Sequence, residues 1–214
     1  MTRRTGPGAP LVEATRQLVH DGLVVGTAGN VSVRVPDGLV ITPTAVPADE
    51  MAPEQLAVLD AEGGQVGGTH RRSSEWRLHL AIYQARPDVG AVVHTHSAAA
   101  TALAVLRLPL PPIHYAMHQL GGEVRVAPYA TFGSVELAQE AAAALKAAHA
   151  VLLANHGAVA VGPDLPTALE RARLLEWLCR VYLEARQGGT PHVLTPTEMA
   201  AAAERFQDYR PSRA

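Results

Sequence analysis

The chain of 214 residues has one cysteine, no long apolar run and no excess of basic residues. A single cysteine, Cys179, excludes a disulfide within the chain, and its apolar helical surroundings favour a buried structural thiol over a nucleophile. No apolar stretch reaches the roughly 18 residues that a membrane span requires. A formal net charge of −2 without a basic cluster argues against a protein that binds nucleic acid or a membrane surface.

The first ten residues also lack the apolar core of a signal peptide. We expect residues 1–10 to be a disordered tail and the protein to be cytoplasmic. An apolar share of 48% is enough for a real core, and neither a repeat nor an interdomain linker is visible. Residues 11–214 are therefore predicted to form one domain.

Alternating apolar and polar residues, interrupted by Asp37-Gly38, predict a β-hairpin over residues 31–41. A second pair of short apolar runs flanks residues 155–157, and neighbouring hairpins of this kind favour a mainly antiparallel sheet. Helical periodicity and capping residues predict the helices that cover it. The expected helices are 11–21, 74–86, 97–106, 134–148, 167–186 and one that begins at the capping box 195–198; further strands are expected at 56–59 and 124–126.

His94 and His96 lie at the end of the apolar run 89–93, which is typical of a buried strand. Residues two apart on a strand point to the same face, so both imidazoles would face one point in space. Two converging neutral imidazoles are a good start for a zinc site. The same pattern also fits a strand end with one buried and one solvated histidine.

A helix start is expected at Ser73 or Ser74, each a candidate N-cap, with Glu75 in the first turn. The N-terminus of a helix offers free N–H groups and a favourable dipole to a phosphate. A capped surface helix with an acidic first turn explains the same residues. His79, one turn further on, is expected to pack behind Glu75.

Asn155-His156-Gly157 joins two apolar runs, as expected of a hairpin or tight bend in which Gly157 adopts a positive φ. His156 would then be a third imidazole at a strand end. A histidine at such a bend can equally well be a simple exposed residue.

Taken together, these segments resemble the class II, zinc-dependent aldolase/adducin family, in particular its fuculose-1-phosphate aldolase type. The resemblance extends from about residue 11 to 209, and the matching motifs occur in the family's order. Each motif alone is weak, whereas the ordered set is specific. The motifs are 26–32, 41–44, 73–77, 92–96, 127–133 and 156–157.

The resemblance implies a three-layer α/β/α domain with a mainly antiparallel central sheet. It implies one Zn²⁺ per chain, held by His94, His96 and His156, with Glu75 both approaching the metal and serving as the base. The chemistry implied is reversible cleavage of a ketose 1-phosphate to dihydroxyacetone phosphate and an aldehyde through an enediolate. The phosphate cradle implied by the resemblance consists of Gly29, Asn30, Thr44, Ser73 and Ser74.

Two tyrosines are assigned to the aldehyde side by the same resemblance. Tyr115 would donate a proton to the aldehyde oxygen, although a lone tyrosine is also often a packing residue. Tyr209 would reach the site of a neighbouring subunit in a homotetramer with sites at subunit interfaces. Phe132 would form part of the pocket wall or of the core.

The chain departs from the fuculose-phosphate type at Ala45, where glycine is usual, and at Asn155, where histidine is usual. The segments around His94 and His156 look more like the pentulose-5-phosphate 4-epimerase branch, whereas Glu75-Trp76 favours the aldolase. The identity of the substrate therefore stays open. The aldehyde could be lactaldehyde, another short hydroxyaldehyde, or the fragment of a deoxy- or methylthio-pentulose phosphate. An adducin-like interaction domain without catalysis would require loss of the metal ligands, and all four are present.

Overall fold

The computed structural model describes the backbone of residues 6–209 and the side chains of residues 6–206. Its centre is an eight-stranded sheet in the order β4-β3-β2-β1-β5-β8-β7-β6, in which only β6 and β7 pair in parallel. The predicted, mainly antiparallel sheet is thus confirmed. The strands are β1 (Asn30–Val35), β2 (Gly38–Ile41), β3 (Ala57–Asp60), β4 (Gln65–Gly67), β5 (Ala91–Thr95), β6 (Val126–Ala127), β7 (Ala150–Leu153) and β8 (Gly157–Gly162).

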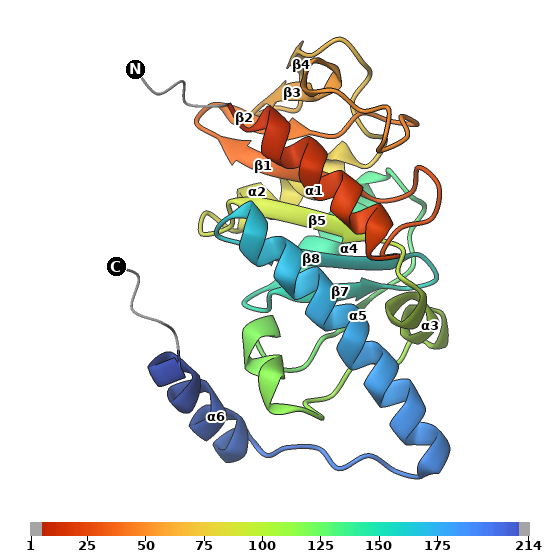
Figure 1. The fold of residues 1–214 in the computed structure, drawn as a ribbon, viewed down its shortest axis with the longest axis vertical. Helices are drawn as coiled ribbons and strands as arrows, with labels where there is room; N and C mark the ends of the chain where they lie inside the picture. Colours follow the sequence, from red (N-terminus) through yellow and green to blue (C-terminus); the bar gives the residue numbers. More distant parts are fainter. Residues whose placement is uncertain (1–5, 210–214) are drawn as a thin grey trace.

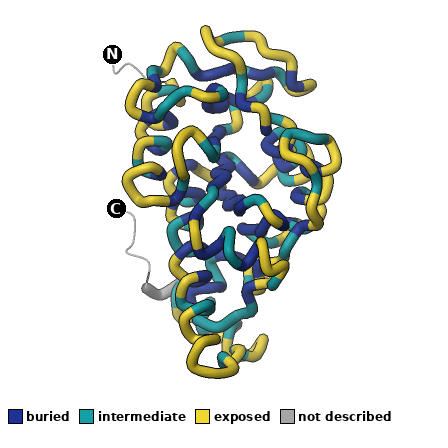
Figure 2. Tube along the Cα trace, turned by 90° about the vertical axis from the view of Figure 1, so that its right-hand side faces the viewer, coloured by how far each residue is buried: buried dark blue, intermediate teal, exposed yellow. Residues whose placement is uncertain are grey.

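Helices cover both faces of this sheet, which confirms the three-layer α/β/α architecture (Figure 1). On one face lie α1 (Gly8–His20) and α5 (Leu165–Gly188), whose apolar sides pack against strands β1, β5 and β8. On the other face lie α2 (Trp76–Ala85) and α4 (Val135–Leu145). The buried chain accordingly runs through the middle of the molecule and the exposed chain lies around it (Figure 2).

A third apolar cluster lies at the far end of α5, where α3 (Ala98–Leu106) and the 3₁₀ helix η2 (Tyr115–Leu120) pack together; Cys179 is buried there as expected. The last helix, α6 (Pro196–Tyr209), lies beside η2 (Figure 1). It begins with the predicted capping box, since the Thr195 N–H donates to Glu198 at 2.7 Å and the Glu198 N–H donates to Thr195 Oγ1 at 3.3 Å. A short 3₁₀ helix, η1 (Pro53–Gln55), precedes β3.

Several boundaries differ from expectation for local reasons. Helix α1 begins at Gly8, so residues 8–10 belong to it and not to a tail. The glycine-rich stretch after β3 contains a short strand, β4, which pairs with β3 across a register shift. Helix α2 begins at Trp76, because Ser73 Oγ accepts the Glu75 N–H at 3.2 Å and forms a turn before the helix instead of capping it. Among the described residues, no helix combines the length and apolarity needed to cross a membrane.

The start of α3 is held by a distant carboxylate. Ser97 occupies the predicted N-cap position, but its side chain makes no capping hydrogen bond. The buried carboxylate of Glu176, on α5, accepts the N–H groups of Ala99 and Ala100, each at 2.9 Å. A carboxylate at a helix N-terminus satisfies free N–H groups and complements the helix dipole. This contact fixes where the chain turns directly after His96.

Replacing Glu176 by alanine is therefore expected to lower the free energy of unfolding by about 2–4 kcal/mol, since a hydrogen bond to a charged group contributes about 1.5–3 kcal/mol. Urea denaturation of the variant measures this loss. Glu184, an exposed glutamate on the same helix, provides the matched control, and its alanine variant should change stability by no more than about 0.5 kcal/mol. Equal effects of the two substitutions would contradict the capping role of Glu176.

Candidate active site

The register of the central strands brings the predicted site residues together. Asn30 in β1 lies directly opposite His94 in β5, and His94 lies opposite Val159 in β8. His156 immediately precedes β8, and Glu75 immediately precedes α2. Four segments that are far apart in the sequence therefore end at one place beside the middle of the sheet.

The side chains of Glu75, His94, His96 and His156 form a compact cluster whose ligand atoms all lie within 4.8 Å of one another. The three imidazole rings face each other edge to face, with centroids 4.8–4.9 Å apart. Glu75 Oε2 lies 3.0 Å from His94 Nε2, and Glu75 Oε1 lies 3.3 Å from His156 Nε2. Three nitrogens and a carboxylate are a donor set suited to zinc and to similar divalent ions.

The hydrogen bonding around this cluster fits a cation at its centre. His94 Nδ1 donates to the carbonyl of Ala158 at 2.9 Å, so Nε2 is the ring atom that faces Glu75 and His96, and it is free to bind a metal ion once it carries no proton. A backbone carbonyl on the second ring nitrogen is the usual way to orient a metal-binding histidine. Glu75 Oε1 is buried without a hydrogen-bond partner among the described residues, although carboxylate oxygens are acceptors only.

The electrostatics agree with this description. Burial, together with positive charge on His94, lowers the pKa of His96 and of His156 to about 4. Burial alone would raise the pKa of Glu75, but His94, His156 and Asn30 outweigh it, and the pKa lies well below its usual range. Burial likewise opposes charge on His94, yet Glu75 raises its pKa. The cluster thus favours positive charge beside Glu75, which a divalent ion held by these residues would supply.

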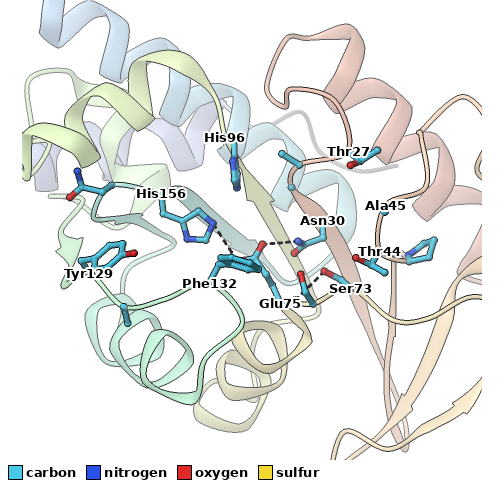
Figure 3. A pocket seen from close by; sticks show the side chains of 16 residues that line it. Thr27, Asn30, Thr44, Ala45, Ser73, Glu75, His96, Tyr129, Phe132 and His156 are labelled. Atoms are coloured by element: carbon cyan, nitrogen blue, oxygen red, sulfur yellow. Dashed lines mark hydrogen bonds and ion pairs between the residues drawn. The ribbon is translucent and has the colours of Figure 1, made fainter.

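A cavity of about 270 Å³ opens next to the cluster. Figure 3 shows Glu75 at its centre, with Asn30, Ser73 and Thr44 on one side and His156 on the other. All five residues of the expected phosphate cradle line this cavity, namely Gly29, Asn30, Thr44, Ser73 and Ser74. The structure therefore brings the cradle and the histidine–glutamate cluster into one site.

Two glycines permit the close approach of the strands here. Gly29 has a φ of +77°, and a Cβ on it would lie 2.8 Å from the carbonyl oxygen of His94. Gly157 was predicted to adopt a positive φ, and this prediction was wrong: Asn155 takes that conformation, with a φ of +54°. Gly157 is required for space instead, since its Cβ would lie 2.3 Å from the carbonyl oxygen of Thr95.

Ala45 also lines the cavity and has a φ of +57°, a conformation that glycine adopts more easily. The restriction expected at this alanine thus does not prevent the backbone from taking the left-handed conformation. Sequence reasoning missed Thr27 and Tyr129, which also line the cavity. Both lie in motifs that carry the family resemblance, 26–32 and 127–133, but neither was assigned a role in the site.

The aromatic residues are placed differently from one another. Phe132 lines the cavity with its side chain largely exposed, so it belongs to the wall and not to the core. Tyr115 lies at the start of η2, is 54% exposed and packs against His114, and it does not line this cavity in its own chain. Tyr209 ends α6, but its side chain lies outside the described residues.

His79 was expected to be a packing residue behind Glu75. In the structure, it also makes hydrogen bonds through both ring nitrogens. The fully buried ring hydrogen-bonds Asn30 Oδ1 through Nε2, and its Nδ1 lies 2.7 Å from Ser32 Oγ. Burial lowers the pKa of His79 to about 3, so the ring is neutral.

Comparison with known proteins agrees with this fold and site. The family profile described as the class II aldolase and adducin N-terminal domain matches residues 9–183. A 5-methylthioribulose-1-phosphate/5-deoxyribulose-1-phosphate aldolase from Rhodospirillum rubrum is 44% identical over 93% of this chain and 90% of its own length. An L-fuculose phosphate aldolase from Escherichia coli K12 is 41% identical over 93% of each chain.

The solved structures include an L-fuculose 1-phosphate aldolase that superimposes with a TM-score of 0.92 at 39% identity, covering 95% of this chain and 97% of that one. The profile spans most of the chain, and the relatives match it nearly end to end. This protein belongs to the class II aldolase and adducin family.

Proposed function

We propose that the protein is a cytoplasmic, zinc-dependent aldolase that reversibly cleaves a ketose 1-phosphate to dihydroxyacetone phosphate and a short aldehyde. One observation carries the proposal. The buried Glu75 lies against three imidazoles at the inner end of a cavity whose other wall carries the polar phosphate cradle. Relatives that resemble this chain over nearly their whole length are named as aldolases of such ketose phosphates.

In this proposal the side chains divide the work. Gly29, Asn30, Thr44, Ser73 and Ser74 bind the phosphate with N–H and O–H donors, and so place the substrate carbonyl beside the histidines. His94, His96 and His156 would hold a divalent ion, which would supply Lewis acidity for that carbonyl. Glu75 takes or returns the proton on the adjacent carbon.

Glu75 is a weak base as long as His94 and His156 lower its pKa. Substrate that separates the carboxylate from these imidazoles would raise that pKa toward its normal value. The base would thus gain strength only once substrate is bound, which limits proton abstraction to the occupied site.

The aromatic residues that line the cavity favour a substrate with an apolar end. Tyr129 and Phe132 line it and are 59% and 66% exposed, respectively. A methyl or methylthio group on the aldehyde fragment would cover part of this aromatic surface, whereas a hydroxymethyl group would lose hydration there. We therefore propose deoxy-ketose 1-phosphates as the substrate class, including L-fuculose 1-phosphate and 5-deoxy- or 5-methylthio-ribulose 1-phosphate.

A product assay tests the proposal directly. The purified, zinc-loaded protein is incubated with each of these three ketose 1-phosphates and with a pentulose 5-phosphate, and the products are identified by NMR. We expect dihydroxyacetone phosphate and the matching aldehyde from at least one 1-phosphate. Epimerisation of the pentulose 5-phosphate without cleavage would instead establish the epimerase alternative, and no reaction with any of the four would contradict the proposal.

We propose further that the active protein is a homotetramer with sites at subunit boundaries. The exposed Tyr115 does not reach the cavity of its own chain, so a role for it at the aldehyde side requires a neighbouring copy. In a closed ring, heterologous contacts place the same element of each subunit beside the next subunit's site. Tyr209, at the end of α6, is proposed to act in the same way.

Removal of residues 207–214 tests this arrangement. We expect metal content and proton exchange on dihydroxyacetone phosphate to persist, while carbon–carbon bond formation slows about 10²-fold, the lower range for loss of a positioned acid. Deuterium wash-in and aldol addition measure the two steps separately. Equal losses in both steps, or in neither, would count against Tyr209, and a monomer in light scattering would exclude its action between subunits.

A further inference from the structure

A buried chain of hydrogen bonds runs from Glu75 away from the cavity and into the core behind it. Asn30 Nδ2 donates to Glu75 Oε2 at 3.0 Å, and Asn30 Oδ1 contacts His79 Nε2. His79 Nδ1 lies 2.7 Å from Ser32 Oγ, which in turn lies 2.8 Å from the Tyr83 hydroxyl. All five side chains are buried. The two strand residues, Asn30 and Ser32, are two apart on β1 and so share one face.

The donor and acceptor of every hydrogen bond in this buried series follow from its first residue, Glu75. The Glu75 carboxylate only accepts, so Asn30 must present its NH₂ to it and its carbonyl oxygen to His79. His79 must then carry its proton on Nε2. A neutral ring in that tautomer has a bare Nδ1, which accepts the Ser32 hydroxyl proton, and Ser32 in turn accepts from Tyr83.

This order leaves no freedom to the Asn30 amide. If its O and N atoms were exchanged, the carbonyl oxygen would face the carboxylate of Glu75 and the NH₂ would face the N–H of His79. The first contact would be repulsive in any tautomer of His79, and the second would be repulsive as long as the ring carries its proton on Nε2; in a buried site such unpaired polar groups are costly. A substitution that removes the Nε2–H donor at position 79 would remove one of the two repulsive contacts that oppose the exchange of the Asn30 O and N atoms.

We infer that His79 is a positioning residue, which fixes the Asn30 amide and through it the orientation of the Glu75 carboxylate. The inference rests on the proposed role of Glu75 as base. With Oε2 held by Asn30, the other oxygen, Oε1, has no hydrogen-bond partner and faces His156, and Glu75 lines the cavity. His79 touches neither the cavity nor the histidine cluster, and it acts only through Asn30.

Three substitutions along the chain separate positioning from mere stability. His79→Leu removes the donor to Asn30 and should lower kcat for proton exchange about 10–100-fold, as loss of a supporting partner typically does. KM should change less than kcat, because the other four cradle residues have no contact with His79 (Gly29, Thr44, Ser73 and Ser74). His79→Gln retains an N–H donor and should recover part of that loss. Tyr83→Phe leaves Ser32, His79 and Asn30 paired and should leave kcat nearly unchanged.

Thermal unfolding of the same proteins provides the comparison. His79→Leu removes the partner of Asn30 Oδ1, and Tyr83→Phe removes one of the two hydrogen bonds of Ser32, so both should lower the melting temperature. Positioning predicts that kcat falls only in the position-79 variants. A fall in kcat that follows the loss of melting temperature across all three would overturn the inference in favour of a purely structural role.

A second readout does not depend on activity. In protein with ¹⁵N-labelled histidine, the His79 signals, assigned by their loss in His79→Gln, should show the neutral tautomer protonated at Nε2. A proton on Nδ1 would overturn the inference whatever the enzyme does. Absence of aldol chemistry and proton exchange in the unmodified protein would instead refute the proposed function, while the tautomer would still decide how the Asn30 amide is held.

Discussion

Replacing His94 by alanine is expected to reduce the bound metal from about one divalent ion per chain to background, because zinc binding needs three or four protein ligands. The His94 ring is fully buried at the centre of the cluster and oriented by the Ala158 carbonyl. Aldol cleavage should fall by about 10³-fold or more, since a Lewis-acid ion contributes several kcal/mol to transition-state stabilisation. Elemental analysis and a cleavage assay on the same sample measure both effects.

The controls distinguish a lost ligand from a lost fold. His192→Ala changes an exposed histidine outside the cluster and should leave the metal and the activity unchanged. His94→Ala removes a buried hydrogen bond to the Ala158 carbonyl and so carries a stability cost, whereas His96 and His156 are only partly buried. Their alanine variants should lose the metal with less loss of stability. Full metal occupancy in the folded His94 variant would refute the assignment.

Glu75→Gln is expected to keep the fold and the metal, and to slow proton exchange beside the substrate carbonyl by about 10²–10⁴-fold, the usual contribution of a positioned base. The glutamine carbonyl can still accept from Asn30, so the geometry is largely retained. The substitution removes the second carboxylate oxygen, Oε1, which faces His156 and has no hydrogen-bond partner in the structure. Deuterium wash-in on dihydroxyacetone phosphate measures the effect.

Glu184→Gln, on the exposed surface of α5, serves as the matched control and should exchange at the normal rate. Near-normal exchange in Glu75→Gln would mean that another group takes the proton. Loss of the metal from that variant would show that Glu75 is needed chiefly as a ligand.

Much of the fold was predictable because local signals and global packing agree. Asp37-Gly38 between alternating residues predicts the β1–β2 hairpin, and the apolar stripe over 167–186 predicts α5. The short strand β4 was missed because Gln65–Gly67 is polar and glycine-rich, and its pairing with β3 provides the only reason for it to be extended. The start of α2 was predicted at residue 74, two residues before its observed start, because no local pattern shows that Ser73 accepts the N–H of Glu75.

For the site, the two-residue spacing of His94 and His96 was a strong local signal, because it follows from strand geometry alone. The meeting of His156 and Glu75 with them came from the ordered motifs of the family resemblance, not from spacing. Contacts between distant segments were invisible at the sequence level, such as Glu176 with the start of α3 and His79 with Asn30. In both cases, the two groups meet only because the whole sheet and its helices pack together.

The register in which Asn30 faces His94 also has a consequence for how the protein folds and unfolds. Residues 30, 75, 94 and 156 meet only after β1, β5 and β8 have paired and α2 has docked, so no early folding species can hold the ion tightly. Contacts absent from the folding transition state act mainly on the unfolding rate. The metal should therefore leave refolding almost unchanged and lengthen the lifetime of the native state, which makes the ion a determinant of kinetic stability as well as of chemistry.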